Sequence, residues 1–201
     1  MVFLDDAMTG EEIRDGEEYE GVRLLFEARL GVAKIPIQVD IGFGDAVVPE
    51  PEPLDYPTLL NFPAPRLLAY PRETVVTEKF QSMVELGIGN SRMKDFFDLW
   101  TLSRMFSFEG ARLTDAIRAT FERRRTSPPT VDPVCFTSDF SSDRDKQAQW
   151  TAFIKRTGVD ARGISLPEVL PVLQRFLMPP TTAAAKGESF TAHWPAGGPW
   201  R

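Results

Sequence analysis

The period of the hydrophobic pattern changes along the chain, and this change limits the folds that the chain can adopt. Residues 22–30 and 35–43 alternate apolar and polar side chains, which is the period of a β-strand. The short segment 31–34 between them predicts a turn, and therefore an antiparallel hairpin over 22–43. A lone hairpin is only marginally stable in water. It must therefore pack on helices of this chain or join a larger sheet.

Helical periodicity begins at Arg72, where apolar residues start to recur at three- and four-residue spacing. The pattern predicts five helices, of which the second is capped by Asn90 or Ser91 and the last ends before Pro179 and Pro180. The five helices cover residues 72–86, 91–106, 111–125, 143–156 and 166–177. The predicted fold class is therefore α+β, with the antiparallel hairpin packed on a C-terminal helical bundle.

The remaining segments are predicted to connect these elements. Residues 1–20 are acidic and weakly patterned, which indicates a loop or a frayed helix, and residues 130–142 indicate a loop. Prolines are frequent in residues 45–72, so regular structure should be scarce there. Apolar side chains interleave with these prolines and indicate a packed connector, with one short strand within residues 65–70.

Three parts are expected along the chain. Residues 1–72 form an α/β part with its proline-rich connector, and residues 73–180 form the helical domain. Residues 181–201 form a tail rich in proline, glycine and alanine. The tail also carries large aromatic residues, which we expect to dock on the body of the protein because exposed aromatic rings are unfavourable in water.

The composition excludes several classes of site. The 201 residues contain one cysteine, Cys135, and one histidine, His193, so a disulfide framework and a Cys-rich zinc site are excluded, and Ser-His catalysis is improbable. The formal net charge of -6 argues against purely electrostatic binding of nucleic acid. Apolar runs fall far short of the ~20 residues that span a bilayer. We therefore expect a cytoplasmic protein with no membrane partner.

Asp40 is a candidate site residue in the second predicted strand. It lies on the polar side of a very apolar segment and is followed by Gly42 and Gly44. One interpretation is a solvent-facing residue on a half-exposed sheet. The other is a carboxylate that a rigid strand holds for metal-assisted phosphoryl transfer.

Lys79 and Asp95 are charged residues on predicted apolar helix faces. Lys79 falls within the arc of Val76, Phe80 and Met83, so its ammonium must either reach solvent or meet an anion. Asp95 falls on the apolar face of the next helix, with Asp98 at its edge. A short connection makes the two helices antiparallel neighbours, so Lys79 and Asp95 should lie within roughly 4 Å. The pair is either a structural lock between helices or part of a functional site.

Three segments carry a family resemblance. They are Ile37-Gln38-Val39-Asp40-Ile41-Gly42-Phe43-Gly44-Asp45, then Tyr70-Pro71-Arg72-Glu73-Thr74-Val75-Val76-Thr77-Glu78-Lys79, then Asn90-Ser91-Arg92-Met93-Lys94-Asp95-Phe96-Phe97-Asp98-Leu99. Over roughly residues 20–200 the chain resembles the nucleotidyl transferase AbiEii/AbiGii toxin family. The resemblance implies a partial nucleotidyltransferase-like sheet and a toxin of a bacterial toxin–antitoxin or phage-defence system.

The resemblance also implies roles for individual residues. Asp40, Lys79 and Asp95 match catalytic positions of the family, and Lys79, Arg92 and Asp98 match substrate-binding positions. Asp40 would also hold the magnesium cofactor. The implied partners are a nucleoside triphosphate, a cognate antitoxin protein and, as for some relatives, tRNA.

One family motif is missing from the expected place. The family begins with a glycine turn followed by Asp-x-Asp on a strand, and residues 1–20 contain no such motif. We expect the chain to correspond to the C-terminal two-thirds of such a toxin, and to be inactive or incomplete as a nucleotidyltransferase. The alternative is a non-catalytic module that binds nucleotide, RNA or the antitoxin.

Overall fold

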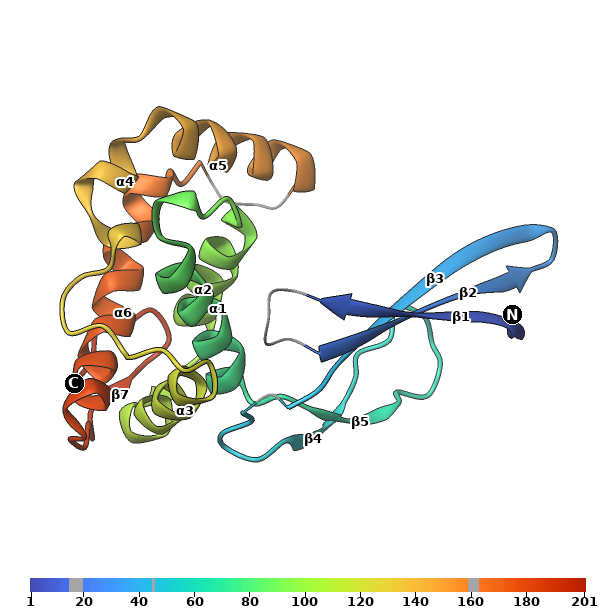
Figure 1. The fold of residues 1–201 in the computed structure, drawn as a ribbon, viewed down its shortest axis with the longest axis horizontal. Coiled ribbons are helices and arrows are strands. Elements are labelled where there is room, and N and C mark those ends of the chain that lie inside the picture. The colour runs from blue at the N-terminus through green and yellow to red at the C-terminus, as the bar shows by residue number, and fades with distance from the viewer. Residues whose placement is uncertain (15–19, 45, 159–162) are drawn as a thin grey trace. The chain divides into compact units, whose positions relative to one another are not determined.

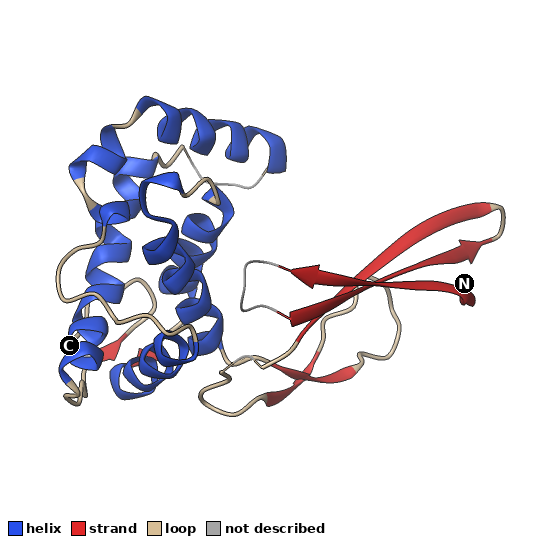
Figure 2. Cartoon of the chain, in the orientation of Figure 1, coloured by secondary structure: helices blue, strands red, loops and turns tan. Residues whose placement is uncertain are grey.

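A computed structural model describes residues 1–14, 20–44, 46–158 and 163–201. The chain divides into two compact units, Met1–Asp45 and Ala46–Arg201, and each is described by itself. An N-terminal antiparallel sheet is followed by six α-helices that pack together, which confirms the predicted α+β class (Figures 1 and 2).

The first unit is a three-stranded antiparallel sheet. Its strands are β1 (Val2–Arg14), β2 (Glu20–Leu30) and β3 (Ala33–Gly42), in the order β1-β2-β3. The predicted hairpin is confirmed as β2 and β3, but its turn is shorter than predicted. Leu30 already pairs with Ala33. The turn therefore consists of two residues, and the first, Gly31, has a φ of +61°, which glycine adopts without strain.

The prediction of a loop or frayed helix at the N-terminus is wrong for Val2–Arg14, which forms β1. The register between β1 and β2 shifts between Leu4 and Thr9. Such an irregularity interrupts the alternation of side chains that marks a strand in the sequence. β1 pairs with β2 and so covers one edge of the hairpin. Residues 15–19, which belong to the same prediction, lie outside the described residues, as does Asp45.

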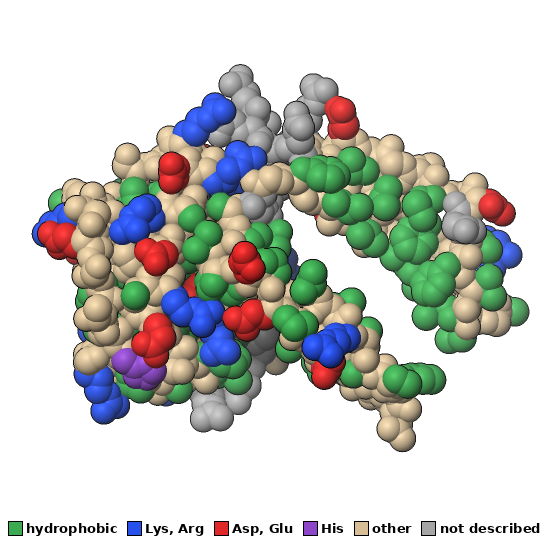
Figure 3. All heavy atoms as spheres, turned by 90° about the horizontal axis from the view of Figure 1, so that it is seen from below, with side chains coloured by type: hydrophobic (Ala, Val, Ile, Leu, Met, Phe, Trp, Pro, Cys, Tyr) green, Lys and Arg blue, Asp and Glu red, His purple; other side chains and the backbone are tan. Residues whose placement is uncertain are grey.

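Large apolar side chains remain exposed on the strand regions of the protein. In the first unit they include Phe3, Val39, Ile41 and Phe43. Figure 3 shows apolar side chains in green on one face of the molecule.

The second unit begins with a further exposed hairpin, formed by β4 (Glu52–Asp55) and β5 (Arg66–Ala69). β5 confirms the short strand predicted within residues 65–70. Its partner β4 lies among prolines, which concealed it in the sequence. The prediction of a packed connector is wrong, because its apolar side chains, such as Leu59, Phe62 and Leu68, are exposed.

The six helices follow, with two short 3₁₀ turns between them. They are α1 (Arg72–Leu86), η1 (Gly87–Gly89), α2 (Met93–Met105), α3 (Gly110–Arg123), η2 (Val134–Phe136), α4 (Ser138–Ser142), α5 (Arg144–Thr157) and α6 (Leu166–Lys186). The five predicted helices are confirmed as α1, α2, α3, α5 and α6. The predicted loop at 130–142 is wrong in part, because η2 and α4 lie within it.

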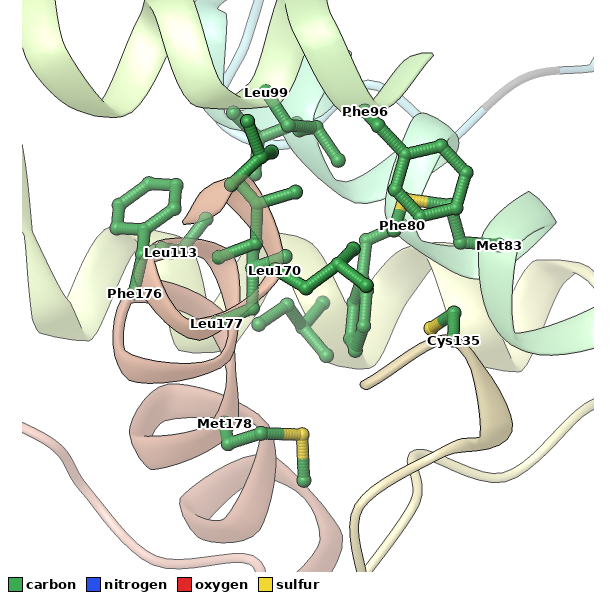
Figure 4. Packing of buried hydrophobic residues seen from close by; sticks show 14 of the residues in the cluster. Phe80, Met83, Phe96, Leu99, Leu113, Cys135, Leu170, Phe176, Leu177 and Met178 are labelled. Atoms are coloured by element: carbon green, nitrogen blue, oxygen red, sulfur yellow. The ribbon is translucent and has the colours of Figure 1, made fainter. Parts of the chain in front are cut away.

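The core of the second unit is built mainly by α1, α2, α3 and α6. Phe80 of α1, Phe96 of α2 and Leu170 of α6 are fully or almost fully buried and lie in one cluster (Figure 4). Helical spacing in the sequence predicts that Phe96, Leu99 and Phe106 share the buried face of α2, which is correct at Phe96 and Leu99 but wrong at Phe106. That residue is exposed, and the guanidinium of Arg72 lies 4.6 Å from the centre of its ring.

The helix α6 continues beyond the point at which its prolines were expected to end it. Pro180 lacks the N–H that would bind the carbonyl of Phe176, four residues earlier. The indole of Trp200 donates a hydrogen bond of 2.9 Å to that carbonyl. The tail therefore supplies the donor that the proline removes, and the helix runs on to Lys186.

The tail docks on the helices through a small two-stranded sheet. β6 (Phe108–Glu109) pairs with β7 (His193–Trp194). The indole of Trp194 donates 2.8 Å to the carbonyl of Ser103 in α2, and its ring centre lies 4.9 Å from that of Phe176. Residues far apart in the sequence thus close one end of the core.

Replacing Gly110 by alanine is expected to destabilise the protein by about 1–3 kcal/mol. A Cβ atom there would lie 2.6 Å from the carbonyl oxygen of Phe190 and 2.7 Å from that of Ala192, so the docked tail would have to move. Urea unfolding followed by tryptophan fluorescence measures the effect. Gly89→Ala is the control, because a Cβ atom at Gly89 meets nothing within 4 Å. Equal stability of the two variants would contradict the close fit.

Candidate functional site

Lys79 forms ion pairs with two carboxylates of the neighbouring helix. Its Nζ lies 2.6 Å from Asp95 Oδ1 and 2.8 Å from Asp98 Oδ2. The predicted contact between Lys79 and Asp95 is confirmed. The three side chains are only 14–24% exposed, so the ammonium meets anions rather than reaching solvent. Helix α1 places Lys79 opposite one face of α2, on which Asp95 and Asp98 lie three residues apart.

The electrostatic environment keeps Lys79 in its charged form. Burial lowers the pKa of the Lys79 ammonium, but the hydrogen bonds and charges of Asp95 and Asp98 outweigh burial, and the pKa lies above its ordinary value. At neutral pH the site therefore presents a fixed cation on a partly buried surface.

Two further cations lie at the start of α2. Lys94 Nζ donates 2.5 Å to Asp98 Oδ2, so Asp98 is shared between two lysines. Arg92, which was predicted to bind substrate, donates 3.3 Å from Nη1 to Ser82 Oγ on α1. The two lysines balance the charges of the two aspartates, and Arg92 contacts Ser82, which lies three residues after Lys79 on α1.

The segment before α2 is held by Asn90, which was predicted as a possible cap, and by Lys146, which the sequence analysis did not identify. The predicted side-chain cap is wrong, because the N-cap position is Arg92, whose side chain makes no capping hydrogen bond to the helix. Asn90 is fully buried, and its Oδ1 accepts a hydrogen bond of 2.8 Å from the backbone N–H of Arg92. The carbonyl of Asn90 accepts 2.9 Å from Lys146 Nζ on α5. The sequence could have revealed Lys146, because it lies four residues before Trp150 and therefore on the apolar face of α5. The same reasoning had identified Lys79.

Asp40 belongs to the first unit, whereas Lys79, Asp95 and Asp98 belong to the second. On β3 it lies opposite Arg23 of β2, which donates 2.8 Å from Nε to Oδ1 and 2.9 Å from Nη2 to Oδ2. Gln38 donates to the same carboxylate. The hydrogen bond from Arg23 lowers the pKa of Asp40 below its ordinary value.

Cys135 and His193 take no part in this site. Burial raises the pKa of the Cys135 thiol to about 12, so it is not a nucleophile at neutral pH. His193 lies in β7, where its Nδ1 is 2.7 Å from Glu109 Oε1 of β6. Cys135 is buried in the core, and the His193 side chain is half exposed on the small sheet of the tail.

The comparison with known proteins decides the family. The family model of the nucleotidyl transferase AbiEii toxin of type IV toxin–antitoxin systems matches residues 3–174. The chain belongs to this family. No similar curated protein and no similar solved structure was found. As an AbiEii toxin the chain is a nucleotidyltransferase toxin, and the family implies an antitoxin partner and a nucleotide substrate.

AbiEii nucleotidyltransferases typically use magnesium, so the fit of this ion to the residues can be tested. Among the described residues, no three His, Cys, Asp or Glu side chains are grouped closely enough to hold a metal ion. Asp40 is engaged by Arg23, and Asp95 and Asp98 are engaged by lysines. In this arrangement the residues do not fit magnesium, because each carboxylate already neutralises a cation. The role of Asp40 as a metal ligand stays a prediction.

The helices also bear on the expectation about membranes. Among the residues that the structure describes, no helix has both the length and the apolar character that crossing a membrane requires.

Proposed function

We propose that the Lys79 cluster is the triphosphate-binding element of this AbiEii toxin. This cluster is the group of ion pairs that is formed by Lys79, Lys94, Asp95 and Asp98. The observation that carries the proposal is the Lys79 ammonium, which Asp95 and Asp98 hold on a partly buried surface. A held ammonium attracts the phosphates of a nucleoside triphosphate, and a nearby guanidinium adds to the field. Lys79 is then the phosphate contact, Arg92 strengthens it, and the two aspartates orient Lys79.

Asp98 pairs with both Lys79 and Lys94, so Lys79 can contact phosphate without leaving Asp98 unpaired. When Lys79 turns one of its N–H donors to a phosphate oxygen, Asp98 keeps its contact with Lys94. An ammonium has three donors, so Lys79 can hold Asp95 and contact phosphate together. No carboxylate of the cluster is left without a cation when phosphate binds.

Nucleotide transfer requires carboxylates that can hold metal ions, whereas nucleotide binding does not. Two-metal phosphoryl transfer needs several carboxylates that are available to hold cations. Asp40, Asp95 and Asp98 each accept a hydrogen bond from a lysine or arginine side chain. This arrangement favours a binding module over a transferase, so we propose that the chain binds nucleoside triphosphate without transferring nucleotide to tRNA.

Binding is expected to be weak and sensitive to salt, because a partly exposed cation is screened as ionic strength rises. Titration of the purified chain with each of the four nucleoside triphosphates, followed by calorimetry in low and high salt, measures this. Lys79→Met should abolish binding, whereas Lys186→Met, at an exposed lysine of α6, should bind like wild type. Equal loss in both variants would mean that the binding is not specific to the cluster.

The absence of transfer is tested with the same protein. The chain is incubated with each radiolabelled nucleoside triphosphate, magnesium and total bacterial tRNA, and the RNA is separated on a gel. We expect no label in the RNA. Label that appears with wild type and disappears with Asp40→Ala would overturn the non-catalytic proposal and assign catalysis to these residues.

A further inference from the structure

Lys146 is a buried cation that the proposed function does not use. It lies in the first turn of α5, where its backbone N–H donates 2.9 Å to Asp143 Oδ1. The residue is 7% exposed. Within the part of the chain that the structure describes, no carboxylate lies within the 4.0 Å of an ion pair with it.

The contacts of the Lys146 ammonium are to neutral groups. Its Nζ donates to the carbonyl of Asn90 at 2.9 Å and lies 5.5 Å from the centre of the Phe140 ring. Burying a cation without an anion is unfavourable, and an apolar side chain of similar length would fill the same space. Packing alone therefore does not account for a lysine here.

What Lys146 holds is the turn that leads into α2. Asn90 ends η1, and its backbone N–H is bound to the carbonyl of Gly87. Its side chain accepts the N–H of Arg92, whose own side chain makes no capping hydrogen bond to α2. The side chain of Asn90 thus holds Arg92 just before the helix, and the ammonium of Lys146 holds the turn itself by donating to the carbonyl of Asn90.

The chain from this turn to the Lys79 cluster is short. Helix α2 begins at Met93, two residues before Asp95. A shift of Asn90 would move the start of α2, and with it the carboxylate that lies 2.6 Å from Lys79. Because an ion pair of this length tolerates little displacement, the anchoring of Asn90 controls where the Lys79 ammonium points.

We propose that Lys146 is a positioning residue for the triphosphate site. It fixes the turn at Asn90 from the neighbouring helix α5, and so holds Asp95 and Arg92 where they orient Lys79 and the phosphates. This inference rests on the proposed function, since it assigns Lys146 to the same site.

The test compares Lys146→Met with Lys155→Met, which removes an exposed lysine of the same helix. Titration with the four nucleoside triphosphates should show roughly tenfold weaker binding for K146M, an effect of the size that residues outside a site exert on it. K155M should stay within about twofold of wild type. Wild-type affinity in folded K146M, with binding lost in K79M, would overturn the inference and leave the proposed function standing.

A second measurement needs no nucleotide. In K146M, hydrogen exchange at the amides of residues 90–95 should speed up while exchange in α3 stays as in wild type, because only the turn loses its anchor. Unchanged exchange at residues 90–95 would overturn the inference. If the wild type binds no nucleotide, the proposed function fails, and the exchange result still tells whether Lys146 anchors the turn.

A neutral and shorter variant, Lys146→Gln, is made in parallel in case K146M does not fold. It should show the same loss of affinity and the same local exchange. Failure of both variants to fold would assign Lys146 to the stability of the bundle and would also overturn its role in positioning.

Discussion

Replacing Trp194 by alanine is expected to destabilise the protein by about 3–5 kcal/mol, the usual range for removing a buried aromatic side chain. Trp194 is 2% exposed and packs against both Phe176 of α6 and Trp200 of the tail. Its loss leaves a cavity at the end of the core that two other aromatic rings line. Chemical unfolding followed by circular dichroism at 222 nm measures the change.

Trp194→Phe separates the two contributions of this residue. Phenylalanine keeps most of the ring contact but cannot donate to the carbonyl of Ser103, which Trp194 reaches at 2.8 Å. We expect Trp194→Phe to lose about 1–3 kcal/mol, the effect of leaving one buried acceptor without its donor. A W194A variant within 1 kcal/mol of wild type, on the order of a surface substitution, would contradict the role of the tail in the core.

Lys79→Met is expected to lose about 2 kcal/mol of stability in addition to nucleotide binding. Removing one partner of a buried ion pair leaves an uncompensated charge, and the effect here is reduced because the side chains are partly exposed and Lys94 still holds Asp98. Asp95, 14% exposed, is left without its cation. Urea unfolding at pH 8 compares wild type, K79M and the exposed-lysine control K186M.

The raised pKa of Lys79 also predicts that its contribution to stability depends on pH. Since the pKa of Lys79 is raised in the folded protein, its contribution to stability is fully present below the pKa of an unfolded lysine, about 10.4. The contribution is lost as the pH rises through the folded pKa. The stability difference between wild type and K79M should therefore shrink above about pH 10.4. A difference that stays constant to pH 12, about the upper limit of such a titration, would exclude a raised pKa.

The Lys79 cluster was predictable from the sequence because it depends on local geometry. Helix periodicity places Lys79 on the core side of α1, and the short η1 connection makes α1 and α2 neighbours. A charged residue on each of the two facing surfaces is then expected to pair with the other, because little water reaches it there. Lys146 obeys the same rule on α5, but its partner is a backbone carbonyl 56 residues away, which no charge pattern in the sequence reveals.

The partner of Asp40 was missed because of the turn. With the predicted four-residue turn, Leu30 would pair with Ile35, and Asp40 would lie opposite Leu25. The two-residue turn pairs Leu30 with Ala33 and shifts Asp40 by two positions, so that it meets Arg23. Strand register depends on turn length, and alternation alone does not fix it. β1 escaped prediction for a related reason, since its register shift breaks the alternation.

The tail also sets the order in which the protein can be completed during synthesis. Trp194 and Trp200 follow all six helices in the sequence, yet one closes the end of the core and the other binds a carbonyl inside α6. A ribosome releases residues 193–201 only after every helix has emerged. The end of the core that Trp194 closes therefore reaches its final packing only after all six helices have been synthesised. The last residues of this sequence are thus the ones that complete the aromatic end of the core.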